Sequence, residues 1–168
     1  MDGPLIVQEN ARAYWIYDIE NPLNVIWKNE YHADTHIHGL EESMKAFIAL
    51  GTEVGKIDGL LGFSQGGCFV DYICRIHHKK ELPFDIKFAI FISAKYFCYD
   101  LELEPIYPLI DVLHMYGTND TIIPADFSAK LSQYYQNKKT YVHEGKHVIP
   151  SSSSAKKALK EFLSSVSN

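Results

Sequence analysis

The sequence predicts an α/β protein built around a mostly parallel sheet. Two continuous apolar runs rich in β-branched and aromatic residues, 87–93 and 111–117, are typical of strands buried on both faces of such a sheet. Around them lie segments in which apolar residues recur at helical spacing, so strands and helices alternate along the chain. The chain has 168 residues, 46% of them hydrophobic and 22% charged, which suits one globular domain over residues 1–168.

The N-terminal part is expected to hold a strand end, a loop and a helix. Residues 1–7 resemble the end of a strand more than a complete element. The aromatic segment 12–21 has no clean period, which predicts a covering loop that either lines an apolar acyl pocket or packs on the surface. An apolar stripe from Leu40 to Ile48 predicts a helix that ends before Gly51.

From residue 57 onward the pattern is regular. The strands are expected at 57–63, 87–93, 111–117 and 140–143. The helices are expected at 65–79, from Pro124 at the first helical position to about Tyr135, and after an N-cap within 151–154.

The segment 58–67 organises the chain, because a short apolar strand runs there into Gly62-Phe63-Ser64-Gln65-Gly66 and then into an amphipathic helix. That context is the one that a Gly-x-Ser-x-Gly nucleophile elbow requires. Gly62 and Gly66 remove side chains that would collide with a serine at strained backbone angles. Ser64 is therefore predicted to be a nucleophile, and the N–H of Gln65, at the positive end of the helix, to be the first oxyanion donor. A glycine-rich turn without catalytic function is the alternative.

Two further polar residues follow predicted strands. Asp120 comes after the strand that ends at Gly117, and His147 after the strand that ends at His143. In such sheets the active groups lie on loops at the carboxyl ends of strands, and Ser, Asp, His is the chain order of α/β-hydrolases. His147 is expected to take the proton of the nucleophile, and Asp120 to orient the imidazole. A turn carboxylate and an ordinary loop histidine are the alternatives.

The composition of the chain limits which partners and which cell compartment are expected. A net charge of -5 and the lack of a basic stripe argue against a nucleic-acid partner. No window has the length and apolarity of a membrane span or a signal peptide, so a cytoplasmic location is expected. The three cysteines, Cys68, Cys74 and Cys98, are an odd number without metal-ligand spacing, which predicts reduced thiols.

Residues 32–38 carry three histidines and an aspartate, which raises a metal hypothesis. Binuclear metallo-hydrolases use a His-x-His-x-Asp-His run, but Leu40 and Glu41 occupy the positions where that run needs Asp and His. We therefore expect polar residues at a helix start, with no metal and no cofactor. A metal-dependent hydrolase is kept only as a minor hypothesis that rests on His32, Asp34, His36 and His38.

Five segments, taken in order over nearly the whole chain, resemble the FSH ("family of serine hydrolases") group of α/β-hydrolases. They are Arg12-Ala13-Tyr14-Trp15, Gly62-Phe63-Ser64-Gln65-Gly66, Ile92-Ser93, Tyr116-Gly117-Thr118-Asn119-Asp120 with Ile123-Pro124, and Glu144-Gly145-Lys146-His147-Val148-Ile149-Pro150. The resemblance implies a three-layer α/β-hydrolase fold, a cytosolic enzyme that acts on carboxylic esters, and a catalytic triad of Ser64, Asp120 and His147.

The start of the chain departs from that group. Its members begin with a strand ending in a His-Gly-Phe type loop, which supplies the second oxyanion N–H, followed by a helix and another strand. Met1-Asp2-Gly3-Pro4 resembles the end of that second strand, so the first two strands and the intervening helix are expected to be missing and the domain to be N-terminally incomplete. Loss of one oxyanion donor costs on the order of 10² to 10³ in rate. An exposed sheet edge beside the elbow strand would favour self-association.

The main hypothesis is a serine esterase, or a thioesterase, that forms an acyl-enzyme at Ser64. Its substrate is expected to be a neutral or apolar small-molecule acyl ester, because no arginine cluster predicts an anion-binding pocket. The alternative is a catalytically weak or inactive hydrolase fold that serves as a binding or regulatory module.

Overall fold

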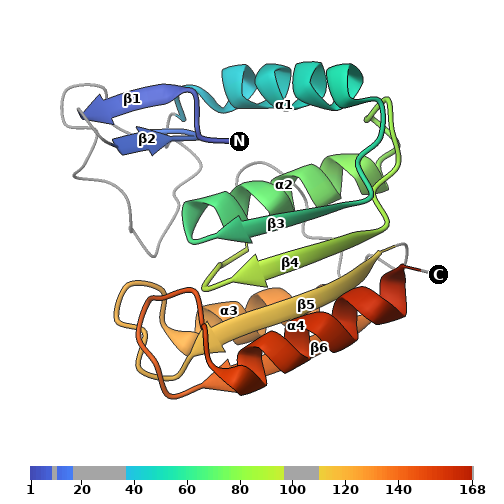
Figure 1. The fold of residues 1–168 in the computed structure, drawn as a ribbon. Helices are drawn as coiled ribbons and strands as arrows, with labels where there is room; N and C mark the ends of the chain where they lie inside the picture. Colours follow the sequence, from blue (N-terminus) through green and yellow to red (C-terminus); the bar gives the residue numbers. More distant parts are fainter. Residues whose placement is uncertain (9–10, 17–36, 97–109, 168) are drawn as a thin grey trace. The chain divides into compact units, whose positions relative to one another are not determined.

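All four strands that the sequence predicts from residue 57 onward are present in a computed structural model of the chain (Figure 1). The structure describes residues 1–8, 11–16, 37–96 and 110–167. They fall into two compact units, one reaching to Lys56 and the other starting at Ile57. The expectation of one domain over residues 1–168 stays a prediction.

The second unit contains a four-stranded sheet in which every pair of neighbours is parallel. Its strands, in spatial order, are β3 (Gly59–Phe63), β4 (Phe88–Ile92), β5 (Asp111–Gly117) and β6 (Lys138–His143). Phe63 pairs with Ile92, Ile92 with Met115, and Gly117 with His143. This register brings the carboxyl ends of all four strands to one edge of the sheet, the edge where ligands bind in such folds.

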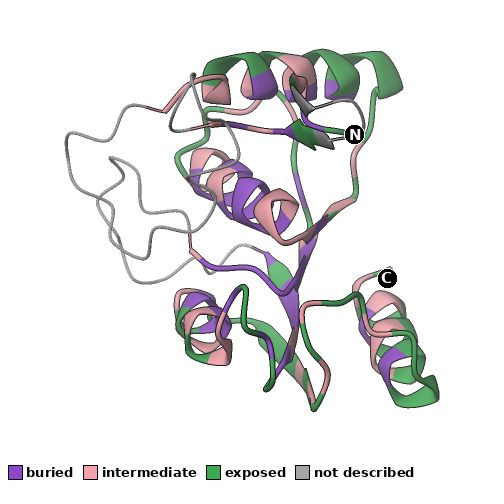
Figure 2. Cartoon of the chain, turned by 90° about the vertical axis from the view of Figure 1, so that its left-hand side faces the viewer, coloured by how far each residue is buried: buried purple, intermediate pink, exposed green. Residues whose placement is uncertain are grey.

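Helices cover both faces of this sheet, which gives the unit three layers (Figure 2). Helices α2 (Gln65–His78) and α3 (Ala125–Gln133) pack on one face, and α4 (Ser153–Val166) packs on the other. On β4, Ala89 and Phe91 join the core under α2 and α3, whereas Ile90 and Ile92 join the core under α4. The central strands are therefore mostly apolar, because both of their faces are buried.

Helix α2 buries more than the apolar face that its sequence pattern shows. Asp71 and Arg75 are buried as an ion pair, with Nε of Arg75 donating to Oδ2 of Asp71 at 2.9 Å. The hydroxyl of Tyr135, just after α3, donates to Oδ1 of Asp71 at 2.7 Å. The shared carboxylate therefore links α2 to the segment that follows α3, and its hydrogen bonds compensate for the cost of burying the charges.

The first unit contains a two-stranded antiparallel hairpin and one helix. The strands are β1 (Leu5–Gln8) and β2 (Ala11–Ala13), and the helix is α1 (Leu40–Val54). The hairpin was not predicted, since the expected covering loop began within it; residues 17–36 of that region lie outside the described residues.

Two predicted helix boundaries are wrong. Helix α1 continues through the buried Gly51 to Val54, and its C-cap is Gly55, which has a φ of 77° and donates its N–H to the carbonyl of Gly51 at 3.0 Å. Only the second glycine has the left-handed geometry that ends a helix. Pro124 is the N-cap of α3 and not its first helical residue, whereas the N-cap of α4 is Ser152, within the predicted range.

Candidate active site

Ser64 lies at the turn between β3 and α2 and has an unusual backbone conformation. Its φ is 56° and its ψ is -124°, a region that residues with a side chain rarely adopt. A Cβ on Gly62 would collide with the carbonyl of Gly66, and a Cβ on Gly67 would lie 2.5 Å from the Cβ of Ala94. The chain can make this sharp turn because those glycines leave room for it, as a nucleophile elbow requires.

Backbone hydrogen bonds fix the serine at this turn. The N–H of Ser64 donates to the carbonyl of Ile92 on the neighbouring strand at 2.9 Å, and the carbonyl of Ser64 accepts from the N–H of Cys68 at 3.1 Å. Gln65, the predicted oxyanion donor, is the first residue of α2, so its N–H belongs to the positive end of the helix dipole.

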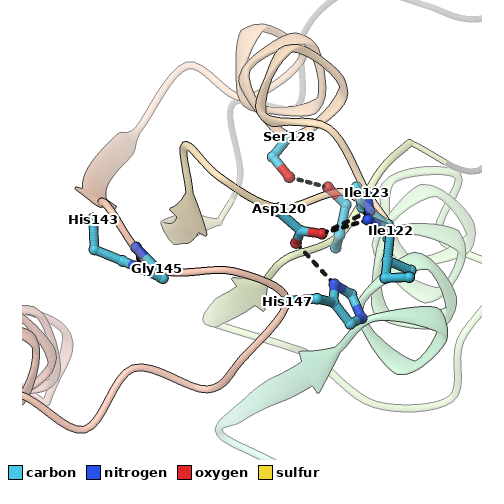
Figure 3. A network of polar contacts seen from close by, with 8 residues as sticks. Asp120, Ile122, Ile123, Ser128, His143, Gly145 and His147 are labelled. Atoms are coloured by element: carbon cyan, nitrogen blue, oxygen red, sulfur yellow. Dashed lines mark hydrogen bonds and ion pairs between the residues drawn. The ribbon is translucent and has the colours of Figure 1, made fainter.

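Asp120 is held by three hydrogen bonds beyond the end of β5 (Figure 3). Its Oδ1 accepts from the N–H groups of Ile122 and Ile123, both at 2.9 Å, and its Oδ2 lies 2.8 Å from Nδ1 of His147. The residue is only 5% exposed. Burial by itself raises the pKa of Asp120, but the hydrogen bonds from His147, Ile123 and Ile122 outweigh it and hold that pKa below its ordinary value.

His147 lies on the segment between β6 and α4, and its side chain is 17% exposed. An ionised carboxylate only accepts hydrogen bonds, so Nδ1 of His147 carries the proton in its bond with Asp120, and Nε2 is the nitrogen that points away from this bond. The ring packs against that of Phe63, with 4.8 Å between centroids. Since Phe63 immediately precedes Ser64, the base lies beside the elbow.

The structure thus brings Asp120 and His147 into direct contact and joins them to the elbow through Phe63. A neutral imidazole that is oriented by a buried carboxylate and lies beside a strained serine can remove a proton from a hydroxyl group. Proton transfer of this kind makes serine a nucleophile toward carbonyl carbon.

Three further residues near this edge of the sheet were not predicted as site residues from the sequence. Ser93, which follows β4, has a φ of 45°, is fully buried, and has a hydroxyl without a hydrogen-bond partner among the described residues. Ser128 on α3 donates to the carbonyl of Ala94 at 2.7 Å. Nδ1 of His143 accepts from the N–H of Gly145 at 3.0 Å. Ser93 and His143 each end or follow a predicted strand, a signal that could have drawn attention to them.

Of the four residues on which the metal hypothesis rests, the structure describes only His38. His32, Asp34 and His36 lie outside the described residues. His38 belongs to the first unit, where its backbone exchanges hydrogen bonds with that of Ile16. Within the described ranges, no three His, Cys, Asp or Glu side chains are grouped so that they could hold a metal ion. In the same ranges, no helix has both the length and the apolar character needed to cross a bilayer.

Comparison with known proteins gives the class of this chain. A model of the serine hydrolase (FSH1) family matches residues 1–159. The chain therefore belongs to that serine hydrolase family.

Among curated relatives, the chain is 32% identical over 162 residues to Esterase OVCA2 of Danio rerio, with 92% of this chain and 68% of that protein covered. It is 30% identical over 165 residues to Esterase OVCA2 of Mus musculus, with 96% and 71% covered. These relatives place the chain among esterase-like hydrolases.

Solved structures agree on the fold. A carboxylesterase from Mesorhizobium loti superposes with a TM-score of 0.67 at 14% identity, covering 97% of this chain and 73% of that one. The protein Atu2452 of unknown function from Agrobacterium tumefaciens superposes with a TM-score of 0.66 at 19% identity, covering 98% and 75%. The fold is that of the α/β-hydrolases, as the sequence predicted.

Proposed function

We propose that this chain hydrolyses carboxylic esters through an acyl-enzyme on Ser64, with His147 as the general base and Asp120 as its orienting carboxylate. The observation that carries the proposal is the 2.8 Å contact between Asp120 and His147 at the edge of the sheet where the strained Ser64 lies. Membership of the serine hydrolase family and the esterase relatives support the choice of ester substrates.

Two half-reactions follow. Oγ of Ser64 attacks the carbonyl carbon of the ester while Nε2 of His147 takes the hydroxyl proton, and the tetrahedral oxyanion forms. The C–O bond to the leaving group then breaks, and His147 returns the proton to the departing alcohol. In the second half, water attacks the acyl carbon, gives a proton to His147, and releases the carboxylic acid, while Ser64 regains its proton.

Asp120 stabilises the imidazolium that forms in each half-reaction. Its depressed pKa keeps the carboxylate ionised at neutral pH, so the negative charge is in place when Nε2 becomes protonated. The N–H of Gln65 is proposed as an oxyanion donor because it stands at the start of α2.

The substrate is proposed to be a small neutral or apolar acyl ester, with thioesters as a further class to test. A cytosolic location is also proposed. Cys68 and Cys74 are buried free thiols, and burial raises the pKa of Cys68 to about 11, so its thiol stays protonated and unreactive. Reduced structural thiols are typical of reducing compartments.

The experiment is labelling of the folded chain with a fluorophosphonate probe that reacts with activated serines. Labelling is expected in the wild type and is expected to vanish in Ser64→Ala and in His147→Ala, with circular dichroism establishing that each variant folds. A chelator should leave the labelling unchanged, which separates this mechanism from a metal-dependent one. A folded wild type that stays unlabelled and inert toward acyl esters would refute the proposal and favour a non-catalytic binding module.

A further inference from the structure

The segment that carries His147 is fastened to the segment that carries Asp120. The N–H of Thr118 donates to the carbonyl of His143 at 2.8 Å, and the N–H of Asn119 donates to the carbonyl of Gly145 at 3.2 Å. The side-chain amide of Asn119 also donates to the carbonyl of Glu144 at 2.5 Å. These bonds set the position of residues 143–145, two residues before the proposed base.

Glycine is required where the two segments approach most closely. A Cβ on Gly117 would collide with the carbonyl oxygen of Gly145. A Cβ on Gly145 would lie 2.6 Å from Nδ1 of His143, so the ring can reach the backbone only because residue 145 has no side chain. The contact between the His143 ring and the backbone of Gly145 therefore depends on glycine at position 145.

His143 closes this loop through its side chain. The ring turns back so that its Nδ1 accepts the N–H of Gly145 at 3.0 Å, and Figure 3 shows both residues on the segment that leads to His147. Because an N–H donates this bond, Nδ1 must be unprotonated, and the ring is neutral with its proton on Nε2. Nε2 is buried and has no hydrogen-bond partner within the described ranges.

Burying the Nε2–H group of His143 without a partner lowers the stability of the folded state, which is unexpected for a residue that only fills space. A buried N–H without a partner destabilises the folded state, and an apolar side chain of similar size would fill the same space without this cost. What an apolar side chain cannot do is accept the N–H of Gly145. The hydrogen bond to Gly145 is therefore the property of His143 that an apolar replacement would lose.

We propose that His143 is a positioning residue for His147: its neutral imidazole fixes Gly145 and thereby the approach of the His147 ring to Asp120 and Ser64. The expected effect on catalysis rests on the proposed function. The claim that His143 sets the position of His147 does not depend on it. The residue touches no reacting atom, so it acts only through the loop.

Two variants separate the hydrogen bond from the bulk of the ring. In His143→Asn the amide oxygen replaces Nδ1 as an acceptor, and in His143→Leu no acceptor remains. We expect kcat for an acyl ester to fall on the order of 10- to 100-fold in the leucine variant with KM nearly unchanged, since a small misplacement of a catalytic group has effects of that size. The asparagine variant should recover most of kcat. Lys146→Ala, an exposed change on the same loop, is the matched control and should leave kcat unchanged.

A structural readout keeps the test independent of catalysis. In NMR spectra, the amide of Gly145 should exchange faster in the leucine variant than in the asparagine variant, and the Nδ1 proton signal of His147 should shift or broaden only in the leucine variant. Equal kcat in all variants, or an unchanged His147 signal when the Gly145 bond is lost, would overturn the proposal. If the wild type neither cleaves esters nor reacts with the fluorophosphonate, the proposed function fails, and the NMR comparison still decides whether His143 positions His147.

Discussion

At the scale of single residues, the backbone strain at Ser64 lowers the stability of the fold at the position of the proposed nucleophile. A non-glycine residue at a φ of 56° and a ψ of -124° costs on the order of 1–3 kcal/mol. The surrounding turn over-determines this conformation through the hydrogen bond from Ser64 to Ile92 and the crowding at Gly62. The folded state therefore holds the serine in place at the expense of its own stability.

Relief of that strain is directly measurable. Ser64→Gly should be more stable than Ser64→Ala by about 1 kcal/mol, because glycine adopts this conformation without strain although it gains more freedom in the unfolded chain. Urea denaturation of both variants measures the difference as a change in midpoint at constant slope. Both lack the proposed nucleophile, so catalysis cannot confound the comparison. An alanine variant at least as stable as the glycine variant would show that the turn is unstrained.

The same scale shows what a sequence can reveal about a site. Ser64, Asp120 and His147 could be proposed from the sequence because each follows a predicted strand, and parallel strands end at a common edge. The strained, buried Ser93 and the ring of His143 could not, because their significance lies in a φ angle and in a hydrogen bond within the loop. The spacing of residues along the chain predicts neither a φ angle nor a hydrogen bond of this kind.

At the scale of elements, the strands were easier to predict than the ends of the helices or the buried charges. Runs of apolar residues define β4 and β5 because both faces of those strands are covered. The end of α1 was missed because a glycine inside a helix and a glycine that ends one look alike in sequence. Burial of Asp71 and Arg75 depends on Tyr135, 64 positions away from Asp71, a partner that no local period can show.

The histidine inside β5 gives a prediction for the strand as an element. His114 is buried, its ring stacks on Phe91 with 4.8 Å between centroids, and its Nε2 has no partner in the described part of the chain. Burial, with a smaller contribution from Lys138, lowers the pKa of His114 to about 3. In the unfolded chain the ordinary histidine pKa is about 6.5. Between these values the unfolded state binds a proton that the folded state does not, so the free energy of unfolding falls as the pH drops.

His114→Phe should therefore flatten the loss of stability between about pH 6.5 and pH 3. One proton taken up on unfolding corresponds to at most about 1.4 kcal/mol per pH unit, and that share of the slope should be missing in the variant. Urea titrations at a series of pH values measure it as the difference between wild type and variant. At neutral pH the phenylalanine should be tolerated, because it keeps the aromatic stack and removes a buried ring nitrogen without a partner. Parallel curves across the whole range would mean that His114 does not titrate on unfolding.

At the scale of the whole molecule, the two edges of the sheet differ in how they are protected. The outer strand β6 begins with Lys138 and Lys139, and charged lysines are a common device against unwanted strand pairing. The opposite outer strand, β3, reads Gly-Leu-Leu-Gly-Phe and has no charge, and its Leu61 is 55% exposed. An exposed edge beside the elbow strand was expected from the sequence, and the sheet order of the described residues places β3 at an edge.

Self-association through β3 is thus the expected behaviour of the chain at high concentration. Sedimentation velocity over a range of concentrations should detect oligomers in the wild type and fewer in Leu61→Lys, since a lysine on an edge strand must lose hydration when a second strand pairs with it. Val142→Lys is the matched control. Val142 lies on β6 and is 47% exposed, and its replacement adds a positive charge to an edge strand that already carries two lysines. Association that persists in Leu61→Lys but is lost in Val142→Lys would assign the contact to β6 instead. A wild type that stays monomeric at every concentration would mean that the β3 edge is covered in solution, so that the absence of charge on this strand reflects its burial and not a contact between copies.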